Sequence, residues 1–239
     1  MAPESVTPQA VTSLEAVTSR EAVTPRENSV SVWYIRHGEN PANLTGELSC
    51  RTVDYPLTSH GVEQARALAD LLSREPAPAA IYASPLRRAA QTAQILATRL
   101  GIPVRTLEEL RELDVGDLEG RSDEQAWELF LDVYYAWHAG DYDRAFPGGE
   151  DFHHVLARLT AALTRALDHP PGSRVLVVAH DGLIRAALPA LCPGTAPPLT
   201  SLPKCGIARV SARTTPGGPE FALLAWPEPD SGDGMPAEA

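Results

Sequence analysis

A histidine with an arginine beside it follows the first strongly apolar segment of the chain. Residues 31–35 read SVWYI and run directly into Arg36 and His37, and Asn43 lies six residues beyond that histidine. Polar groups at the carboxyl end of a central strand are where open α/β sheets place their ligands. An imidazole there can act as a nucleophile, and a guanidinium beside it can bind an anion. The tripeptide Arg-His-Gly is a weak motif by itself and needs support from the rest of the chain.

A second histidine, His180, ends the other very apolar segment, residues 174–179. Asp181, Gly182 and the start of a predicted helix follow it. The glycine lets a ligand approach, and the N-terminus of the helix offers N–H groups and positive potential to an anion. Two histidines at the ends of two buried strands can converge on one crevice. The alternative is that both only form hydrogen bonds at the ends of their strands.

A third predicted strand end is followed by two arginines, Arg87 and Arg88, in the sequence SPLRRAAQTA of residues 84–93. A guanidinium in the first turn of a helix at this point can reach the same crevice. The chain now resembles the histidine phosphatase superfamily, in its phosphoglycerate-mutase-like branch, from about Val30 to Leu191. Six motifs carry the resemblance, in the order of the family: RHGENPAN, DYPLTSHGVEQA, SPLRRAAQTA, LRELDVGDLEG, PGGED and VVAHDGLIRAAL.

The resemblance implies a role for each of these residues. It makes His37 the nucleophile that becomes phosphorylated. It surrounds the phosphate with four polar side chains, namely Arg36, Asn43, Arg88 and His180. Of the two adjacent arginines, Arg88 matches the position used by the family, and Arg87 is expected to be a solvated helix residue. Gly182 is expected beside the phosphate, at the start of the helix that follows His180.

The same resemblance makes Glu112 the general acid, because it lies four residues before Gly116, where the family carries that acid. The neighbouring acids of this segment are expected to be solvated loop residues. Burial beside the charge of the phosphate would keep the carboxyl of Glu112 protonated near neutral pH. Glu112 can then protonate the leaving alkoxide and afterwards deprotonate water.

The chemistry of such a site follows from charge. A phosphomonoester carries roughly two negative charges, which repel an anionic nucleophile but admit a neutral imidazole. Two guanidiniums and a protonated second histidine can neutralise the equatorial oxygens, as metal ions do in many other phosphoryl-transfer sites. We therefore expect no metal and no cofactor. His153 and His154 are adjacent on a predicted helix, diverge by about 100°, and make a poor metal pair.

Two departures from the family pattern bear on the substrate. Where the family often has a Thr-Gly or Gln-Gly pair that contacts substrate, this chain has Cys50 and Arg51, and Arg51 could bind a second anionic group. Asp181 stands where glycine or asparagine is more usual. Its carboxylate could favour the charged form of His180 or cap the helix that follows.

Seven aromatic residues gather between positions 127 and 146. Trp127, Phe130, Tyr134 and Trp137 have helical spacing, which favours a stripe facing the core over an aromatic lid on the substrate site. The segment lies between the Glu112 loop and the PGGED motif, so it could still roof the site.

The sequence thus predicts a phosphomonoesterase that hydrolyses a small phosphorylated metabolite through phosphohistidine on His37. One alternative is a phosphoglycerate mutase dependent on 2,3-bisphosphoglycerate. It is disfavoured because family mutases carry a longer, lysine-bearing, proline-rich insertion where this chain has residues 127–146. The other alternative is a phosphate-binding module without catalysis, which the presence of all four central residues disfavours: His37, Arg88, Glu112 and His180. The substrate itself and the oligomeric state stay open.

The elements that must position these residues follow from the hydropathy pattern. From Ser29 onward, short apolar segments alternate with helical periodicity, which is typical of α/β proteins. Strands are expected at 31–35, 79–83, 103–107 and 174–179, and helices at about 59–73, 86–100, 123–139, 151–167 and 183–191. A hairpin over residues 206–226 follows them. We expect an α/β three-layer sandwich in which helices cover both faces of a mostly parallel central sheet.

Composition limits the domain organisation and the partners. The chain has 239 residues and 44% hydrophobic content, enough for one compact domain, which we place at residues 29–226. Residues 1–28 are expected to be a disordered low-complexity arm, and residues 227–239 a disordered acidic tail. A net charge of -11 gives no basic stripe for nucleic acid.

Basic residues and cysteines complete the picture. Lys204 is the only lysine among 20 basic residues, which indicates a compositional bias toward arginine. The three cysteines have no CxxC spacing, so neither a disulfide framework nor a zinc site is indicated. The N-terminus lacks a secretory pattern and no segment is long enough to span a bilayer. These features favour a cytoplasmic protein without a membrane partner.

Overall fold

The computed structural model describes residues 28–192 and 200–227. Its centre is a six-stranded sheet in the order β3-β2-β4-β1-β5-β6. The first four strands in that order are parallel, and they are β1 (Val30–Arg36), β2 (Ala80–Ala83), β3 (Val104–Thr106) and β4 (Arg174–Ala179). The hairpin of β5 (Ile207–Thr215) and β6 (Gly218–Ala225) joins β1 in the antiparallel direction. The mostly parallel sheet expected from the sequence is confirmed.

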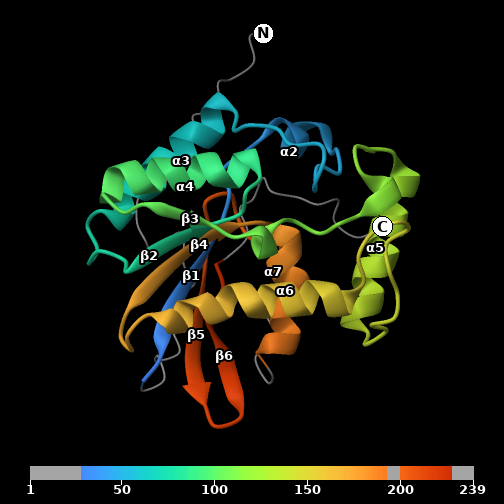
Figure 1. Cartoon of the computed structure of the whole chain (residues 1–239). Helices are drawn as coiled ribbons and strands as arrows, with labels where there is room; N and C mark the ends of the chain where they lie inside the picture. The colour runs from blue at the N-terminus through green and yellow to red at the C-terminus, as the bar shows by residue number, and fades with distance from the viewer. Residues whose placement is uncertain (1–27, 193–199, 228–239) are drawn as a thin grey trace.

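Helices cover both faces of the sheet, so the molecule has three layers (Figure 1). One face carries α3 (Ser59–Leu72) and α4 (Arg87–Leu100), and the other carries α6 (Phe152–Thr164) and α7 (Asp181–Leu191). The helix α5 (Glu124–His138) stands at the end of the layers where the parallel strands terminate (Figure 1).

Residues of β1 alternate between the two layers. Val32 and Tyr34 belong to the core under α6 and α7, whereas Trp33 and Ile35 belong to the core under α3 and α4. A parallel strand that is buried on both faces reads as a continuous apolar segment, which is why β1 and β4 were evident in the sequence. Because β1, β2 and β4 are neighbours and run parallel, the residues that follow them emerge at one edge of the sheet.

The predicted elements are found with small differences at their ends. The last predicted helix begins at Asp181 rather than at residue 183, and the helix predicted for 151–167 ends at Thr164, where the 3₁₀ helix η3 (Arg165–Asp168) continues the chain. Two further 3₁₀ turns, η1 (Glu108–Leu110) and η2 (Gly116–Leu118), flank the Glu112 segment.

The short helix α2 (Pro41–Thr45) was not predicted. Its single turn is held by reciprocal capping between Asn40 and Asn43, with a proline at its start. One turn is too short to produce a hydrophobic period, so only its capping residues could have signalled it.

The arm and the tail expected from the sequence lie outside the described residues, apart from positions 28 and 227 at their inner ends. In the described part of the chain, the model has no helix with the length and apolar character needed to cross a membrane. The cytoplasmic location stays a prediction.

Candidate active site

The two histidines meet at the carboxyl edge of the sheet. The N–H of His37 donates to the carbonyl of Ala179 at 3.0 Å, which fastens the residue after β1 to the end of β4. The centroids of the His37 and His180 rings lie 5.2 Å apart, and both side chains are buried. The sequence-based expectation that the two strand ends converge is therefore correct.

The surroundings of His37 favour the neutral form of its imidazole. Its Nδ1 lies 2.7 Å from the carbonyl oxygen of Gly38. Because a carbonyl only accepts, Nδ1 must carry the proton and Nε2 keeps its lone pair. Burial, followed by the charges of Arg88 and Arg36, lowers the pKa of His37 well below its usual value. The imidazole therefore presents an unprotonated Nε2 at neutral pH.

Arg88 points its guanidinium at that same nitrogen. Its Nε donates to Nε2 of His37 at 3.2 Å, and its Nη1 lies 3.6 Å from a carboxylate oxygen of Asp54. Burial lowers the pKa of Arg88, which remains a strong base. Arg87 is exposed, and its main-chain N–H donates to Asp54 at 2.8 Å. The structure thus places Arg88 and not Arg87 against the nucleophile.

His180 completes the group from the end of β4. Its Nε2 lies 2.8 Å from the hydroxyl of Ser84, and its Nδ1 is buried without a hydrogen-bond partner among the described residues. Burial and the charge of Arg88 lower the pKa of His180 well below its usual value. The sequence predicted a protonated imidazole, and this environment favours the neutral one. A phosphate dianion close to His180 would oppose that effect.

Asp181 does not act as the sequence suggested. It is the first residue of α7 and provides no side-chain cap. Its carboxylate accepts hydrogen bonds from Ser201 Oγ at 2.8 Å and from Leu202 N at 2.8 Å, and it forms an ion pair with Arg185 at 3.2 Å. It therefore ties α7 to the segment before β5 instead of directing a charge at His180.

Glu112 reaches the same cavity from the loop between η1 and η2. Its carboxylate accepts from three main-chain N–H groups, those of Leu113 at 2.9 Å, Gly182 at 3.1 Å and Leu183 at 2.7 Å. Burial raises the pKa of Glu112 despite these bonds and the charge of Arg88. The direction is the one that a general acid requires.

Gly182 therefore contacts the candidate acid. The sequence placed Gly182 beside the phosphate; in the structure its N–H donates to Glu112, and the residue lines the cavity. A Cβ at this position would lie 2.8 Å from Oε1 of Glu112, so only glycine allows the carboxylate to approach the start of α7 this closely.

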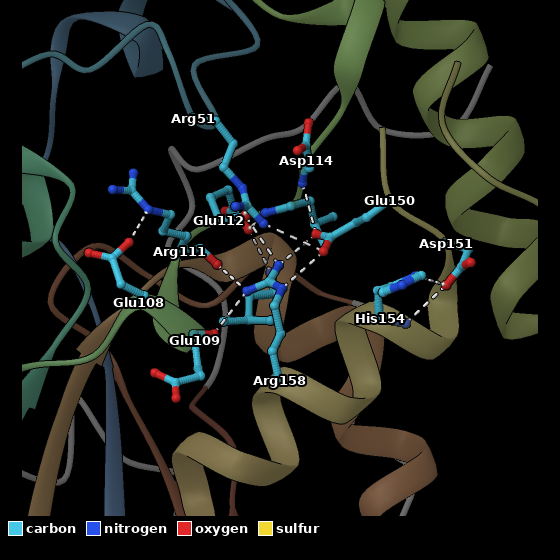
Figure 2. A network of polar contacts seen from close by, with 12 residues as sticks. Arg51, Glu108, Glu109, Arg111, Glu112, Asp114, Glu150, Asp151, His154 and Arg158 are labelled. Atoms are coloured by element: carbon cyan, nitrogen blue, oxygen red, sulfur yellow. Dashed lines mark hydrogen bonds and ion pairs between the residues drawn. The ribbon is translucent and has the colours of Figure 1, made fainter. Parts of the chain in front are cut away.

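The loop that carries Glu112 is held by Arg158 of α6, as Figure 2 shows. Its guanidinium donates to the carbonyls of Glu109 at 3.0 Å, Arg111, and Glu112 at 3.1 Å. Glu150 grips the guanidinium with both carboxylate oxygens, at 2.6 and 3.0 Å, and accepts from the N–H of Asp114 at 2.8 Å. Glu150 belongs to the PGGED motif, so this motif holds the Glu112 loop in place through Arg158 and Asp114.

Arg51 joins this network and does not bind a free anion. Its Nε donates to the carbonyl of Glu112 at 3.0 Å, and its Nη2 lies 3.5 Å from the carboxylate of Glu150 (Figure 2). The N–H groups of residues 50–53 all point to the carboxylate of Glu119, at 2.9 to 3.1 Å. The suggestion that Arg51 recognises a second anionic group is therefore not supported.

A cavity of about 280 Å³ lies against part of this group, and His180, which is fully buried, is not in its wall. His37, Arg36, Arg88, Glu112, Asn43 and Gly182 all contribute to its wall. The Oδ1 of Asn43 accepts from the N–H of Asn40 at 3.1 Å, so its amide nitrogen is the group left for a ligand.

The aromatic residues of α5 contribute both to the core and to the cavity wall. Phe130, Tyr134 and Trp137 belong to the buried core, and Trp127 packs against it. Trp127, Phe130 and Tyr134 also line the cavity on the side away from the sheet.

Several residues at the cavity were not predicted as site residues, although Asn40 and Ser84 lie within two of the motifs. Asn40, Ser201 and Lys204 line the cavity, and Ser84 lies against His180. The guanidinium of Arg36 donates to Ser201 Oγ at 2.8 Å and to the carbonyl of Leu202 at 2.5 Å, across 165 positions of sequence. Among the described residues, no three His, Cys, Asp or Glu side chains gather as ligands for a metal ion would.

The chain is similar to known proteins over most of its described length. The family model of the histidine phosphatase superfamily (branch 1) matches residues 32–226. A protein of Arabidopsis thaliana named phosphoglycerate mutase-like protein 4 is 36% identical over 154 residues, 64% of this chain and 66% of that protein. Metal-independent phosphoserine phosphatase of the same plant is 34% identical over 154 residues, 64% of each chain. The match thus spans slightly less than two thirds of either plant protein.

A solved structure shares the fold. The native structure of a mycobacterial glucosyl-3-phosphoglycerate phosphatase superimposes with a TM-score of 0.69 at 29% sequence identity. The superposition covers 84% of this chain and 99% of that one. The three-layer fold expected from the sequence is confirmed by this neighbour.

Proposed function

The chain belongs to the histidine phosphatase superfamily, branch 1, and we propose that it is a phosphomonoesterase that works through a phosphohistidine at His37. The observation that carries the proposal is the placement of two groups with opposite pKa shifts in one cavity. His37 is neutral there, while burial raises the pKa of Glu112. A neutral nucleophile and a protonated acid are the pair needed to split a phosphomonoester.

The reaction has two steps. Nε2 of His37 attacks phosphorus, the bond from phosphorus to the alcohol oxygen breaks, and Glu112 gives its proton to that oxygen. Water then attacks the phosphohistidine while the Glu112 carboxylate takes a proton from it. The phosphorus–nitrogen bond breaks, orthophosphate leaves, and both residues return to their starting protonation states.

Arg36 and Arg88 supply positive charge to the phosphate oxygens throughout. Both guanidiniums are buried beside His37, where electrostatic stabilisation is stronger than in water. The unpartnered Nδ1 of His180 is a further group for a phosphate oxygen. With this many charged and polar groups in place, the proposed reaction needs no metal, and one of the plant relatives carries the name of a metal-independent phosphatase.

The substrate class we propose is a small phosphorylated metabolite. A cavity of about 280 Å³ suits such a molecule. Relatives named for phosphoserine and glucosyl-3-phosphoglycerate dephosphorylation support hydrolysis of small phosphomonoesters. A phosphoglycerate mutase is the second candidate, because a plant relative bears a mutase-like name. The segment 127–146 contains no lysine and no proline, unlike the insertion of family mutases, which favours hydrolysis.

Trapping of the intermediate tests the proposal. Brief incubation with a ³²P-labelled phosphomonoester and an alkaline quench should yield a base-stable, acid-labile label on the peptide that contains His37. His37→Ala should abolish both the label and turnover. His154→Ala, which alters an exposed histidine of α6, is the matched control and should retain both. Full turnover in His37→Ala would overturn the mechanism.

A further inference from the structure

Lys204 is the only lysine of a chain whose other 19 basic residues are arginines, and it lines the active-site cavity. It shares the cavity wall with Arg36, His37 and Arg88. An ammonium group differs from a guanidinium in being compact, with three donors around one charged atom. The only lysine ammonium of the chain thus lies in the cavity where a phosphate is expected to bind.

Hydrogen bonds fasten the segment that carries Lys204 to the nucleophile strand. The N–H of Arg36 donates to the carbonyl of Gly206 at 3.2 Å, and the N–H of Cys205 donates to the carbonyl of Arg36 at 3.1 Å. The side chain of Arg36 binds Leu202 and Ser201 in the same segment. Lys204 therefore lies between residues that are hydrogen-bonded to Arg36, the neighbour of His37.

A second anchor comes from α7. Asp181 accepts from Ser201 Oγ and Leu202 N, both at 2.8 Å. The chain then turns at Cys205, which is buried and has φ 58°, in the left-handed region. A non-glycine residue in that conformation costs free energy, so the surrounding contacts hold this turn in place. The main chain is thus held in place both before and after Lys204.

The charge of Lys204 acts on the nucleophile end of the cavity. It is one of the cations that lower the pKa of His37, together with Arg88 and Arg36. The cations that act most on Glu112 are instead Arg88 and Arg158. In an in-line displacement the leaving group departs opposite the nucleophile, toward the acid. Lys204 also follows the strand end of Arg36 in space, since Cys205 N donates to the Arg36 carbonyl, so it lies toward the nucleophile end of the cavity wall.

We propose that Lys204 is a further phosphate-binding residue, which places its ammonium against the outer oxygens of the phosphate. The inference rests on the proposed function and extends it. Arg36 already donates to main-chain and side-chain oxygens, and Arg88 donates to His37, so each presents only part of its donors to substrate. A third cation in the cavity wall adds positive charge for the phosphate oxygens.

The test measures binding and turnover in the full chain. Lys204→Met should raise the KM for p-nitrophenyl phosphate and the inhibition constants of orthophosphate and vanadate about 10- to 100-fold. The loss should be the same for alkyl phosphates, because the contact is to the phosphate and not to the leaving group. Lys204→Arg, which keeps the charge, should recover most of the vanadate affinity. Arg87→Met, which removes an exposed charge next to Arg88, is the matched control and should leave all of these constants unchanged.

Other outcomes would overturn the inference. Unchanged vanadate and orthophosphate constants in Lys204→Met would show that Lys204 does not contact the phosphate. A loss confined to substrates with a second anionic group, such as 3-phosphoglycerate, would assign Lys204 to the leaving group instead. If the wild-type chain binds vanadate but hydrolyses no phosphomonoester, the proposed function fails, and vanadate titrations of the two Lys204 variants still decide the role of Lys204.

Discussion

The two side chains proposed to react share one environment, and it shifts their pKa values in opposite directions because imidazole is charged when protonated and a carboxyl when deprotonated. Burial in the same cavity removes charge from both, so it lowers the pKa of the imidazole of His37 and raises the pKa of the carboxyl of Glu112. Arg88 reinforces the first shift and opposes the second. The two shifts favour a neutral imidazole and a protonated carboxyl, which are the forms that the proposed first step requires.

Substitution of Glu112 should affect substrates according to their leaving group. Glu112→Gln keeps the shape, and its single oxygen can keep the hydrogen bonds from Leu113 and Leu183, but it cannot donate an acidic proton. An alkoxide needs that proton in the transition state, whereas a nitrophenolate leaves largely unaided. We expect kcat/KM for alkyl phosphates to fall about 10²- to 10⁴-fold, and that for p-nitrophenyl phosphate to fall much less. Steady-state kinetics on both substrates measure the difference.

Two neighbouring acids serve as controls for that experiment. Glu109→Gln and Asp114→Asn remove carboxylates from the same loop that do not line the cavity, so both should keep the wild-type ratio between the two substrates. A selective loss in either one would mean that the acid has been misassigned. Equal losses on both substrates in Glu112→Gln would indicate a positioning role.

At this scale the sequence predicted the residues that sit in motifs and missed those that sit between them. His37, Arg88, Glu112 and His180 were found because their motifs match a known pattern. Lys204 was not, since it reaches the site from a segment whose sequence shows no pattern of its own. Ser84 opens the SPLRRAAQTA motif, but nothing in the sequence indicated its contact with His180. The role suggested for Arg51 is not supported by its contacts, because its position in the sequence says nothing about the carbonyl and the carboxylate that engage it.

Among the elements, the loop of Glu112 depends most on its neighbours. Only single turns of 3₁₀ helix flank it, and short turns of this kind supply few hydrogen bonds of their own. Arg158 of α6 satisfies three carbonyls of the loop and is itself held by Glu150. The geometry of the acid is thus set by a helix, which is more rigid than the loop.

Removal of that support should disturb both stability and catalysis. Arg158→Met leaves the mostly buried carboxylate of Glu150, 9% exposed, with only the more distant Arg51, at 3.5 Å, as a cation. We expect the free energy of unfolding to fall by about 3–5 kcal/mol. Turnover of alkyl phosphates should fall more than that of p-nitrophenyl phosphate, because the acid is displaced while the phosphate pocket is not. Denaturant unfolding and steady-state kinetics measure the two effects.

The double variant Arg158→Met/Glu150→Gln distinguishes the two contributions. It removes the unpaired charge, so it should regain much of the stability but not the lost turnover of alkyl phosphates. Arg111→Met, which breaks the partly exposed ion pair with Glu108, is the control and should cost less than about 1 kcal/mol. If Arg158→Met retained full activity on alkyl phosphates, Arg158 would have no part in positioning the acid.

The helices and strands were predictable where burial leaves a pattern of apolar residues in the sequence. Strands β1 and β4 were clear because both of their faces are covered, and α5 was clear because its stripe of aromatic residues keeps helical spacing. The helix α2 was missed because one turn leaves no period. The order of strands in the sheet had no signal in the chain, since it depends on how the helices pack between strands and not on any single segment.

For the whole molecule, the fold gathers its buried titratable groups at one edge of the sheet, and this makes stability depend on pH. Burial lowers the pKa of His37, His180 and His138 in the folded chain. Between those lowered values and about 6.5, the unfolded chain binds more protons than the folded chain. The free energy of unfolding is therefore highest above about pH 6.5, and it falls as the pH falls below that value. The raised pKa of Glu112 has the opposite sign, because the folded chain then holds a proton that the unfolded chain releases.

The histidines should dominate this balance just below neutrality. We expect the free energy of unfolding to fall by up to about 2.7 kcal/mol between pH 7.5 and 5.5 from His37 and His180 together, about 1.4 kcal/mol for each. His180→Asn should reduce that fall by about half, and Glu112→Gln should make it steeper because the opposing group is gone. Saturating vanadate should flatten it in the wild-type chain, since a bound anion favours the charged form of His180. Urea titrations across this pH range measure each slope, and a slope that is the same in His180→Asn as in the wild type would show that this buried imidazole is not the group that titrates.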